Sequence, residues 1–426
     1  MKNTIYCILF LLVTAFGFAQ DKQLLQTGII IDSVKVASNP TESYAIYFPK
    51  KYDAKTPLAL VFIFEPSARG KMGIEPFILA AETYNYILVC SNTLKNGSTQ
   101  NNISIANRLF DDVLQNYAVD TSQLYISGFS GGARLASYFG ISTSVFQGVI
   151  ACGASFTGTD KFIPPSNNFS YVGMVGDKDM NYQEMIKNKE WLDKSRIVNT
   201  LFVSHEDHVW PKQSEMLRAF DWLEIQAYRK NLKPKNDTII KRIYDKNLQI
   251  ADSLKANKEM VLSMNAYEKG ITFLNTNEDN FLRTKISEIK KSREYKDEIA
   301  KIEKIKVLEN EILDKLWLRF DQELKSAKSN TNFKFWKSEI KDLNAMKLDN
   351  KNVLAQNMAI RILFSFQISV YEAGQENKRN QQNDKFTYCQ NCIKLSLRQI
   401  REKSRFQSSE GEISKMDNYN GITFLF

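Results

Sequence analysis

Histidine is scarce in this chain of 426 residues, which contains only His205 and His208. The two lie three positions apart in the stretch SHEDHVWP, so any histidine-dependent chemistry must use this one segment. No constellation of metal ligands and no glycine-rich phosphate loop is found elsewhere. The sequence therefore predicts neither a metal nor a cofactor.

Long apolar runs are lacking after the first 20 residues, which predicts that no later segment spans a membrane. The N-terminus itself, MKNTIYCILFLLVTAFGFAQ, has a lysine, an apolar run and small residues before Gln20. This pattern is typical of a secretory signal peptide (residues 1–19) cleaved near Ala19, with an uncleaved anchor as the alternative. The mature protein is expected to be exported, to the periplasm or the medium.

Cysteine is also rare, and four of the five residues remain after cleavage. Cys90 and Cys152 fall in apolar runs, where a free cysteine is usually a small core residue. Cys389 and Cys392 have CxxC spacing, and export permits a disulfide between them. Because no second CxxC or nearby histidine accompanies the pair, a zinc site is not indicated, and redox catalysis is disfavoured.

Charge is distributed unevenly. Residues 20–226 contain 18 Lys and Arg against 21 Asp and Glu, a net charge of −3, whereas residues 227–426 contain 38 against 27, a net charge of +11. Nucleic-acid binding is one explanation of a basic excess. For an exported protein we expect instead solvated helix faces or a protein or envelope partner for the basic half, and no nucleic acid.

The first half alternates short apolar runs with amphipathic stretches. Several runs are continuously apolar, as in strands buried on both faces of a parallel sheet. The predicted strands cover 44–49, 58–64, 86–91, 123–127, 146–152, 170–176 and 199–204. The predicted helices cover 75–84, 103–117, 131–140, 181–195 and 213–229. This alternation predicts an α/β domain over residues 20–230 with a mostly parallel sheet flanked by helices.

The second half has a different texture. A polar, proline-containing stretch, NLKPKND (231–237), marks a plausible boundary. Beyond it we expect an all-α domain over 231–426, with a helix, turn and helix in 266–292 and its most apolar helix in 352–374. Helix pairs of this kind weakly resemble degenerate tetratricopeptide-type repeats, but no clean period is found, and a bundle fits equally well.

The sharpest motif is Gly128-Phe129-Ser130-Gly131-Gly132, which matches G-x-S-x-G between an apolar strand run and an amphipathic helix. In that context the serine is a candidate nucleophile at a tight strand-to-helix turn. A serine hydroxyl needs a base, and the base needs an orienting carboxylate. Two later strand runs end in Asp177-Lys178-Asp179 and in the histidine pair, so the chain order is serine, acid, histidine.

These motifs resemble the α/β-hydrolase superfamily, and most closely its secreted esterase branch of polyhydroxybutyrate depolymerase-like and feruloyl esterase-like enzymes. The resemblance covers residues 40–228. It implies that the acid follows a glycine by three positions, which selects Asp179 after Gly176. It also implies an H-x-W-P context for the base, which selects His208 and leaves His205 to hydrogen-bond a loop or to close the pocket rim.

The oxyanion-hole region departs from that family. Many relatives have His-Gly after the strand that corresponds to 58–64, whereas this chain continues with Glu65-Pro66-Ser67. Proline has no N–H to donate. The predicted donors are therefore the backbone N–H groups of Gly131 and of Ser67 or a neighbour. Glu65 is expected either to pair with Arg69 or Arg134 or to be a solvated loop acid.

Three functions remain open from the sequence. The first is an exported serine hydrolase that cleaves small-molecule, carbohydrate or hydroxy-acid esters through an acyl-enzyme. The second is a serine peptidase, although no propeller-like region precedes the catalytic half. The third is a non-catalytic scaffold or binding protein on a hydrolase fold, which works through its helical half.

Overall fold

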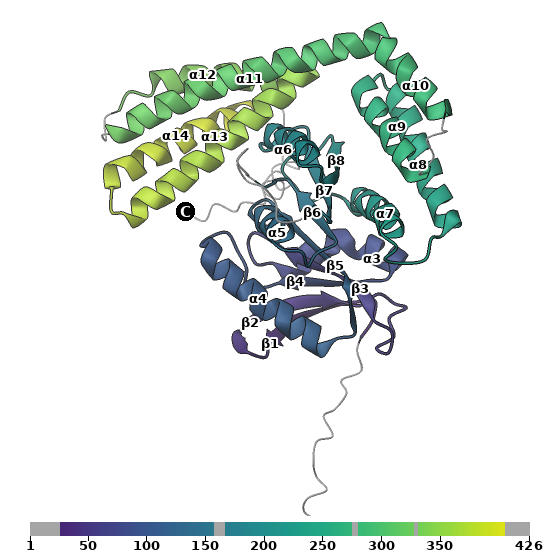
Figure 1. Cartoon of the computed structure of the whole chain (residues 1–426). Coiled ribbons are helices and arrows are strands. Elements are labelled where there is room, and N and C mark those ends of the chain that lie inside the picture. Colours follow the sequence, from purple (N-terminus) through teal and green to yellow (C-terminus); the bar gives the residue numbers. More distant parts are fainter. Residues whose placement is uncertain (1–25, 157–166, 275–279, 328–330, 405–426) are drawn as a thin grey trace, which may run out of the picture.

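The computed structural model describes residues 26–156, 167–274, 280–327 and 331–404 (Figure 1). The predicted signal peptide and the turn between the two predicted helices of 266–292 lie outside these ranges. The strands are β1 (Ile30–Val36), β2 (Asn39–Tyr47), β3 (Leu58–Phe64), β4 (Tyr86–Ser91), β5 (Val119–Phe129), β6 (Gly148–Cys152), β7 (Ser170–Gly176) and β8 (Val198–Ser204).

All eight strands form one sheet in the order β1-β2-β4-β3-β5-β6-β7-β8. The pairs β1–β2 and β2–β4 are antiparallel, and every other pair is parallel. In the central strands nearly every side chain is buried, as expected where helices cover both faces. The predicted α/β-hydrolase fold, a mostly parallel sheet with flanking helices followed by a helical region, is confirmed.

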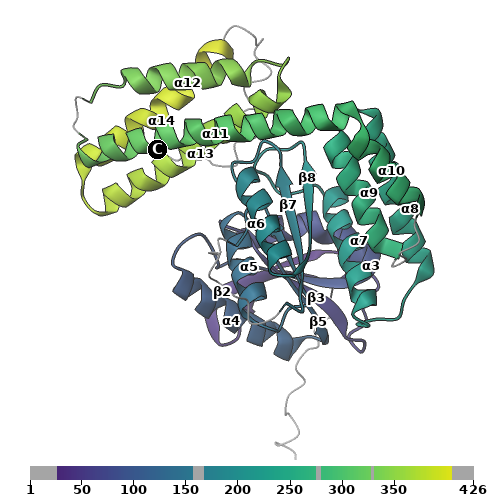
Figure 2. The same cartoon turned by 45° about the horizontal axis from the view of Figure 1, so that its top comes forward.

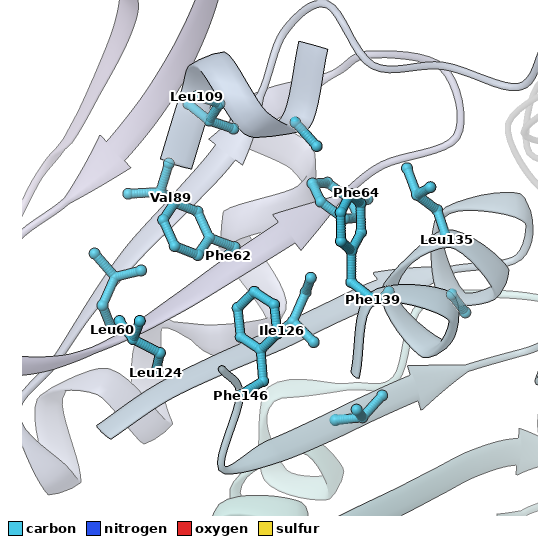
Figure 3. Close-up of a cluster of buried hydrophobic side chains, with 14 of the residues drawn as sticks. Leu60, Phe62, Phe64, Val89, Leu109, Leu124, Ile126, Leu135, Phe139 and Phe146 are labelled. Atoms are coloured by element: carbon cyan, nitrogen blue, oxygen red, sulfur yellow. The ribbon is translucent and has the colours of Figure 1, made fainter. Parts of the chain in front are cut away.

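Helices cover the two faces of the sheet with separate apolar cores. One core packs α4 (Thr99–Asn116) and α5 (Gly131–Ser142) against the sheet, and Figure 3 shows its aromatic centre around Phe62, Phe64 and Phe139. The other core packs α3 (Ile78–Tyr84) and α7 (Gln213–Arg229) against the opposite face. Both faces of the sheet are therefore covered by well-packed helices. Also in this half are α2 (Gly70–Ile74), the 3-10 turn η1 (Glu75–Phe77) and α6 (Tyr182–Lys194).

The predicted strands at 58–64, 86–91 and 170–176 have the same bounds in the structure. Strand β1 was not predicted. It lies at the sheet edge, pairs only with β2, and has two register irregularities in that pairing. An edge strand with most side chains partly or fully exposed lacks the continuous apolar signal that reveals a buried strand.

After α7 the chain is helical. The helices are α8 (Asp237–Ala256), α9 (Met260–Leu274), α10 (Asn280–Lys291), α11 (Arg293–Lys325), α12 (Lys334–Lys347), α13 (Val353–Arg379) and α14 (Asn383–Ser404). The figures show α8, α9 and α10 beside α7, while the long α11 runs over the end of the sheet to the group formed by α12, α13 and α14 (Figures 1 and 2). We call residues 237–404 the helical half.

Helix α13 is the core helix that the sequence predicted at 352–374. Its buried side chains, among them Ile362 and Phe366, centre an apolar cluster with α11, α12 and α14. Contrary to the expectation that no later segment could span a membrane, α13 is long and apolar enough to do so by length and composition. Half of its apolar window is buried inside the protein, where the helix packs in the cluster with α11, α12 and α14.

Candidate active site

Ser130 lies at a sharp turn between β5, which ends at Phe129, and α5, which begins at Gly131. Its backbone has φ 52° and ψ −121°, a left-handed conformation that costs a non-glycine residue free energy. The Ser130 N–H donates to the carbonyl of Cys152 at 2.9 Å, which ties the turn to the end of β6. The serine is therefore held in strained geometry at the start of a helix, as the G-x-S-x-G motif predicts.

Two glycines make this turn possible by allowing close backbone approach. A Cβ on Gly128 would overlap the carbonyl of Gly132, the second residue of α5. A Cβ on Gly132 would overlap the carbonyl oxygen of Phe64, the last residue of β3. Since backbone atoms cannot move aside as a flexible side chain can, these positions require glycine.

The candidate acid and base follow β7 and β8. His208 Nδ1 lies 2.9 Å from Asp179 Oδ2, and the two side chains are 9% and 1% exposed. The Asn181 N–H donates to the other carboxylate oxygen, Asp179 Oδ1, at 2.8 Å. A buried carboxylate on Nδ1 orients the imidazole so that Nε2 is the free nitrogen, which is the arrangement required of a general base.

Close packing of the two loops brings this pair together. A Cβ on Gly176 would overlap the carbonyl of Glu206, so the loop after β7 lies directly on the loop after β8. Gly153, at φ 65°, has Phe129, Asp179 and His208 around it within 3.2 Å of the position a Cβ would take. The rings of Phe129 and His208 have centroids 4.6 Å apart. Phe129 thus connects the serine turn with the base.

The structure places Ser130, Asp179 and His208 at the carboxyl ends of β5, β7 and β8. Among the hydrogen bonds of the described residues, none joins Ser130 Oγ to His208. Such bonds are often long without substrate and tighten when substrate binds. The acid and base are therefore paired, while the serine and base are neighbours through Phe129.

His205 has other partners. Its Nδ1 lies 2.7 Å from Asp177 Oδ2, and its Nε2 lies 2.7 Å from Glu259 Oε2, in the turn between α8 and α9. The hydrogen bond with Asp177 raises the pKa of His205 to about 9, so at neutral pH the ring is charged. Both ring nitrogens have partners, so His205 is a loop contact. It links residues 26–229, which we call the hydrolase half, to the helical half.

Helix α13 also reaches the acid loop. The Arg361 guanidinium donates to the backbone oxygen of Asp177 at 2.5 Å and to both carboxylate oxygens of Glu309 on α11, at 2.7 and 2.5 Å. Arg361 and Glu309 are 5% and 3% exposed, and Gln183 donates to Glu309 at 2.9 Å. One turn along, the Phe364 ring lies 5.8 Å from the His208 ring. The helical half therefore contacts both the acid loop and the base.

The predicted oxyanion loop is organised around Glu65, which is 1% exposed and so is not a solvated acid. Its carboxylate pairs with Arg69 and also accepts the N–H groups of Ser67, at 2.8 Å, and Arg69, at 2.9 Å. Arg134, the other partner considered, pairs with Glu184. Because the Ser67 N–H is already engaged, Ser67 is not available as the second oxyanion donor in this conformation.

Gly131, the other predicted donor, begins α5 directly after Ser130. A Cβ at this position would overlap Oδ1 of Asn96 and would lie 3.3 Å from Asn96 Nδ2. Asn96 comes from the loop between β4 and α4. The side-chain amide of Asn96 therefore lies against the residue whose N–H is expected to face the oxyanion.

The described residues contain neither a cluster of metal ligands nor a reactive cysteine pair. No group of three His, Cys, Asp or Glu side chains could hold a metal ion there. Cys389 and Cys392 are buried, free thiols on α14, and burial raises the pKa of Cys389 to about 11, so it is not a reactive thiolate. A cavity of ≈ 20 Å³ adjoins Asp179 and Trp210, which is room for about one water molecule.

Several residues at the site were not predicted from the sequence. Arg361, Glu309 and Phe364 lie more than 100 residues from the triad candidates, on helices whose polar residues follow the ordinary amphipathic pattern. Asn96 lies in a loop with no motif. Arg361 had one faint signal, since a lone arginine within the most apolar helix requires a buried partner.

Comparisons with known proteins find similarity of this chain to solved structures alone. No protein-family model and no curated protein sequence matches it. It is similar to the solved S-formylglutathione hydrolase of Staphylococcus aureus, with 13% identity, 46% of this chain and 98% of that chain covered, and a TM-score of 0.38. It is also similar to a feruloyl esterase module from Clostridium thermocellum, with 14% identity, 44% of this chain and 84% of that chain covered, and a TM-score of 0.35. For an esterase from the archaeon Pyrobaculum calidifontis, the identity is 11%, the coverage is 47% of this chain and 87% of that chain, and the TM-score is 0.38. All three similarities cover less than half of this chain. The strand order of the sheet and the turn at Ser130 show that residues 26–229 have an α/β-hydrolase fold.

Proposed function

We propose that this protein is a serine hydrolase of the carboxylesterase type, acting on esters of small molecules, carbohydrates or hydroxy acids. The observation that supports it most is the strained Ser130 at the end of β5, beside a buried Asp179–His208 pair. Strain of this kind persists where the surrounding structure holds it, and it concentrates at functional sites. A scaffold would need neither the strain nor the oriented imidazole.

In the proposed mechanism Ser130 Oγ attacks the ester carbonyl while His208 Nε2 takes its proton. Asp179 holds the ring through Nδ1 and stabilises its charged form. The Gly131 N–H and a second donor stabilise the negative charge on the carbonyl oxygen. The leaving alcohol departs with the proton from His208. Water then attacks the acyl-enzyme while His208 takes its proton, and the carboxylic acid leaves as that proton returns to Ser130 Oγ.

The test is hydrolysis of p-nitrophenyl acetate and butyrate by the purified protein. Ser130→Ala and His208→Ala are expected to lower kcat by at least about 10³-fold, as for other triads. His205→Ala is the matched control, because it removes the neighbouring imidazole from a partnered loop position. If the folded protein shows no Ser130-dependent turnover and no labelling of Ser130 by a fluorophosphonate probe, the proposal fails in favour of the scaffold. Turnover of peptides in place of esters would favour the peptidase.

We also propose that the protein is exported, with cleavage near Ala19. The support is the N-terminal sequence alone, with its lysine, apolar run and small residues before Gln20. Mass spectrometry of the protein recovered from the cell envelope or the medium is expected to find Gln20 as the N-terminal residue. Full-length protein retained in the membrane would show an anchor instead.

A further inference from the structure

The second oxyanion donor has to come from outside the loop after β3. In that loop Pro66 has no N–H, and Glu65 engages the rest through its side chain or its backbone. The Ser67 and Arg69 N–H groups donate to Glu65 Oε2, and the Ala68 N–H donates to the Glu65 carbonyl at 3.1 Å. An oxyanion that forms on Ser130 would therefore find no free N–H in residues 66–69.

Asn96 offers the missing donor. Its amide packs so closely on Gly131 that any side chain there would overlap it. Among the described residues no hydrogen bond engages this amide, and the residue is exposed, so the NH2 group is available to a ligand. In an asparagine the oxygen and nitrogen exchange positions by a half-turn of the amide, so either can face the site.

The backbone around Asn96 is anchored to the oxyanion loop. The Asn96 N–H donates to the Pro66 carbonyl at 2.8 Å, and Lys95 forms a β-bridge with Ser67. On the other side, Asn102 Nδ2 donates to the Lys95 carbonyl at 2.8 Å. The backbone that carries the Asn96 side chain is therefore held at three points, which limits where the amide can lie, as an oxyanion donor oriented before reaction requires.

On the basis of the proposed hydrolase function, we infer that the Asn96 side-chain amide is the second oxyanion donor, in place of a backbone N–H of the loop after β3. As Ser130 Oγ bonds to the carbonyl carbon, the π electron pair moves to the carbonyl oxygen. Asn96 Nδ2–H and the Gly131 N–H donate to that oxygen. When the C–O bond of the leaving group breaks, the pair returns and both hydrogen bonds weaken. This role also explains Gly131, because a Cβ there would push the amide away.

The test compares Asn96→Ala and Asn96→Asp with the wild type and with Lys95→Ala, an exposed neighbour on the same loop. Asn96→Ala is expected to lower kcat for p-nitrophenyl butyrate by about 10²–10³-fold with little change in KM, since the bond forms only in the transition state. Asn96→Asp is expected to lose more, because a carboxylate repels the oxyanion. Lys95→Ala is expected to retain wild-type kcat. Binding of an aryl trifluoromethyl ketone, which forms a tetrahedral adduct with serine, is expected to weaken in parallel.

A change of less than about threefold in kcat for Asn96→Ala would overturn the inference, and so would an increase, which would mean that the amide obstructs the hole. Gly131→Ala is expected to lower kcat in the wild type but to add little in the Asn96→Ala background, because the two share one contact. Equal proportional losses in both backgrounds would overturn the inference as well. Failure of the proposed function is distinct, since it appears as wild-type protein without Ser130-dependent turnover or labelling.

Discussion

The two halves of this molecule contribute to the candidate site in different ways. The hydrolase half uses backbone constraints: glycines at 128, 132 and 176 allow the chain to approach itself, and Ser130 is strained. Among the residues that the structure describes, the helical half contacts the site through side chains, chiefly Arg361, Phe364 and Glu259.

This difference has a consequence for how each half tolerates change. Where two backbone segments touch at a glycine, no other residue fits. A buried side-chain ion pair, in contrast, can be replaced by apolar residues if both charged partners are removed together. Contacts from both halves meet at Asp177, whose backbone oxygen accepts from Arg361 of the helical half and whose carboxylate pairs with His205 of the hydrolase half. The acid loop is therefore the place where the halves depend on each other.

The largest effect is expected from breaking the buried pair of the helical half. Arg361→Met leaves the Glu309 carboxylate buried, with Gln183 as its remaining donor, and removes the donor to Asp177 O. Removing one partner of a buried ion pair costs about 3–5 kcal/mol of the free energy of unfolding. Urea unfolding followed by circular dichroism measures this loss.

The matched control is the double variant Arg361→Met with Glu309→Met, which removes both charges and is expected to recover most of the stability. A single variant that is destabilised by less than about 1 kcal/mol would contradict the description of this pair as a buried link.

The next effect tests the backbone constraint of the hydrolase half. Gly132→Ala would place a Cβ on the carbonyl oxygen of Phe64 and 2.7 Å from its carbon, so β3 and α5 must separate. Overpacking of this kind costs about 1–3 kcal/mol or more, and turnover is expected to fall because the shift moves Ser130. Thermal unfolding and p-nitrophenyl butyrate hydrolysis measure the two losses.

The corresponding glycine of the helical half serves as control. A Cβ on Gly374, in α13, would lie 3.2 Å from the Cβ of Cys389, a side-chain atom that has only to give slightly. Alanine also has a better helix propensity by about 1 kcal/mol. Gly374→Ala is therefore expected to be near neutral, and comparable losses at both glycines would remove the distinction between the halves.

The smallest effect is expected at His205, which is 57% exposed in its side chain. Its pKa is raised to about 9 in the folded protein from 6.5, so its contribution is fully present below pH 6.5 and is lost as the pH rises through about 9. Exposed pairs of this type contribute about 0.2–1 kcal/mol. The melting temperature of His205→Gln is expected to lie below that of the wild type at pH 6 and to approach it by about pH 10. A difference that is independent of pH would show that His205 acts by packing.

The sequence was sufficient for most of the hydrolase half. Continuous apolar runs between turn residues predicted β3, β4 and β7 with their observed bounds, because strands buried on both faces carry the strongest local signal. The order of serine, acid and histidine along the chain predicted the segments of the acid and the base. The resemblance to secreted esterases selected Asp179 and His208 within them, and the structure brings these two side chains to 2.9 Å. Edge strand β1, partly exposed and irregular, had no comparable signal.

What the sequence by itself determined, then, is whatever depends on local pattern: the alternation of strands and helices, the glycines around Ser130, and the helical character of the second half. Only the tertiary structure decided that Glu65 occupies the Ser67 N–H, that Asn96 lies against Gly131, and that Arg361 reaches the Asp177 carbonyl from 184 residues away along the chain. The physical reason is that a single polar side chain has no periodicity. Its partner is set by how the layers pack, and packing brings together residues that no spacing in the sequence relates.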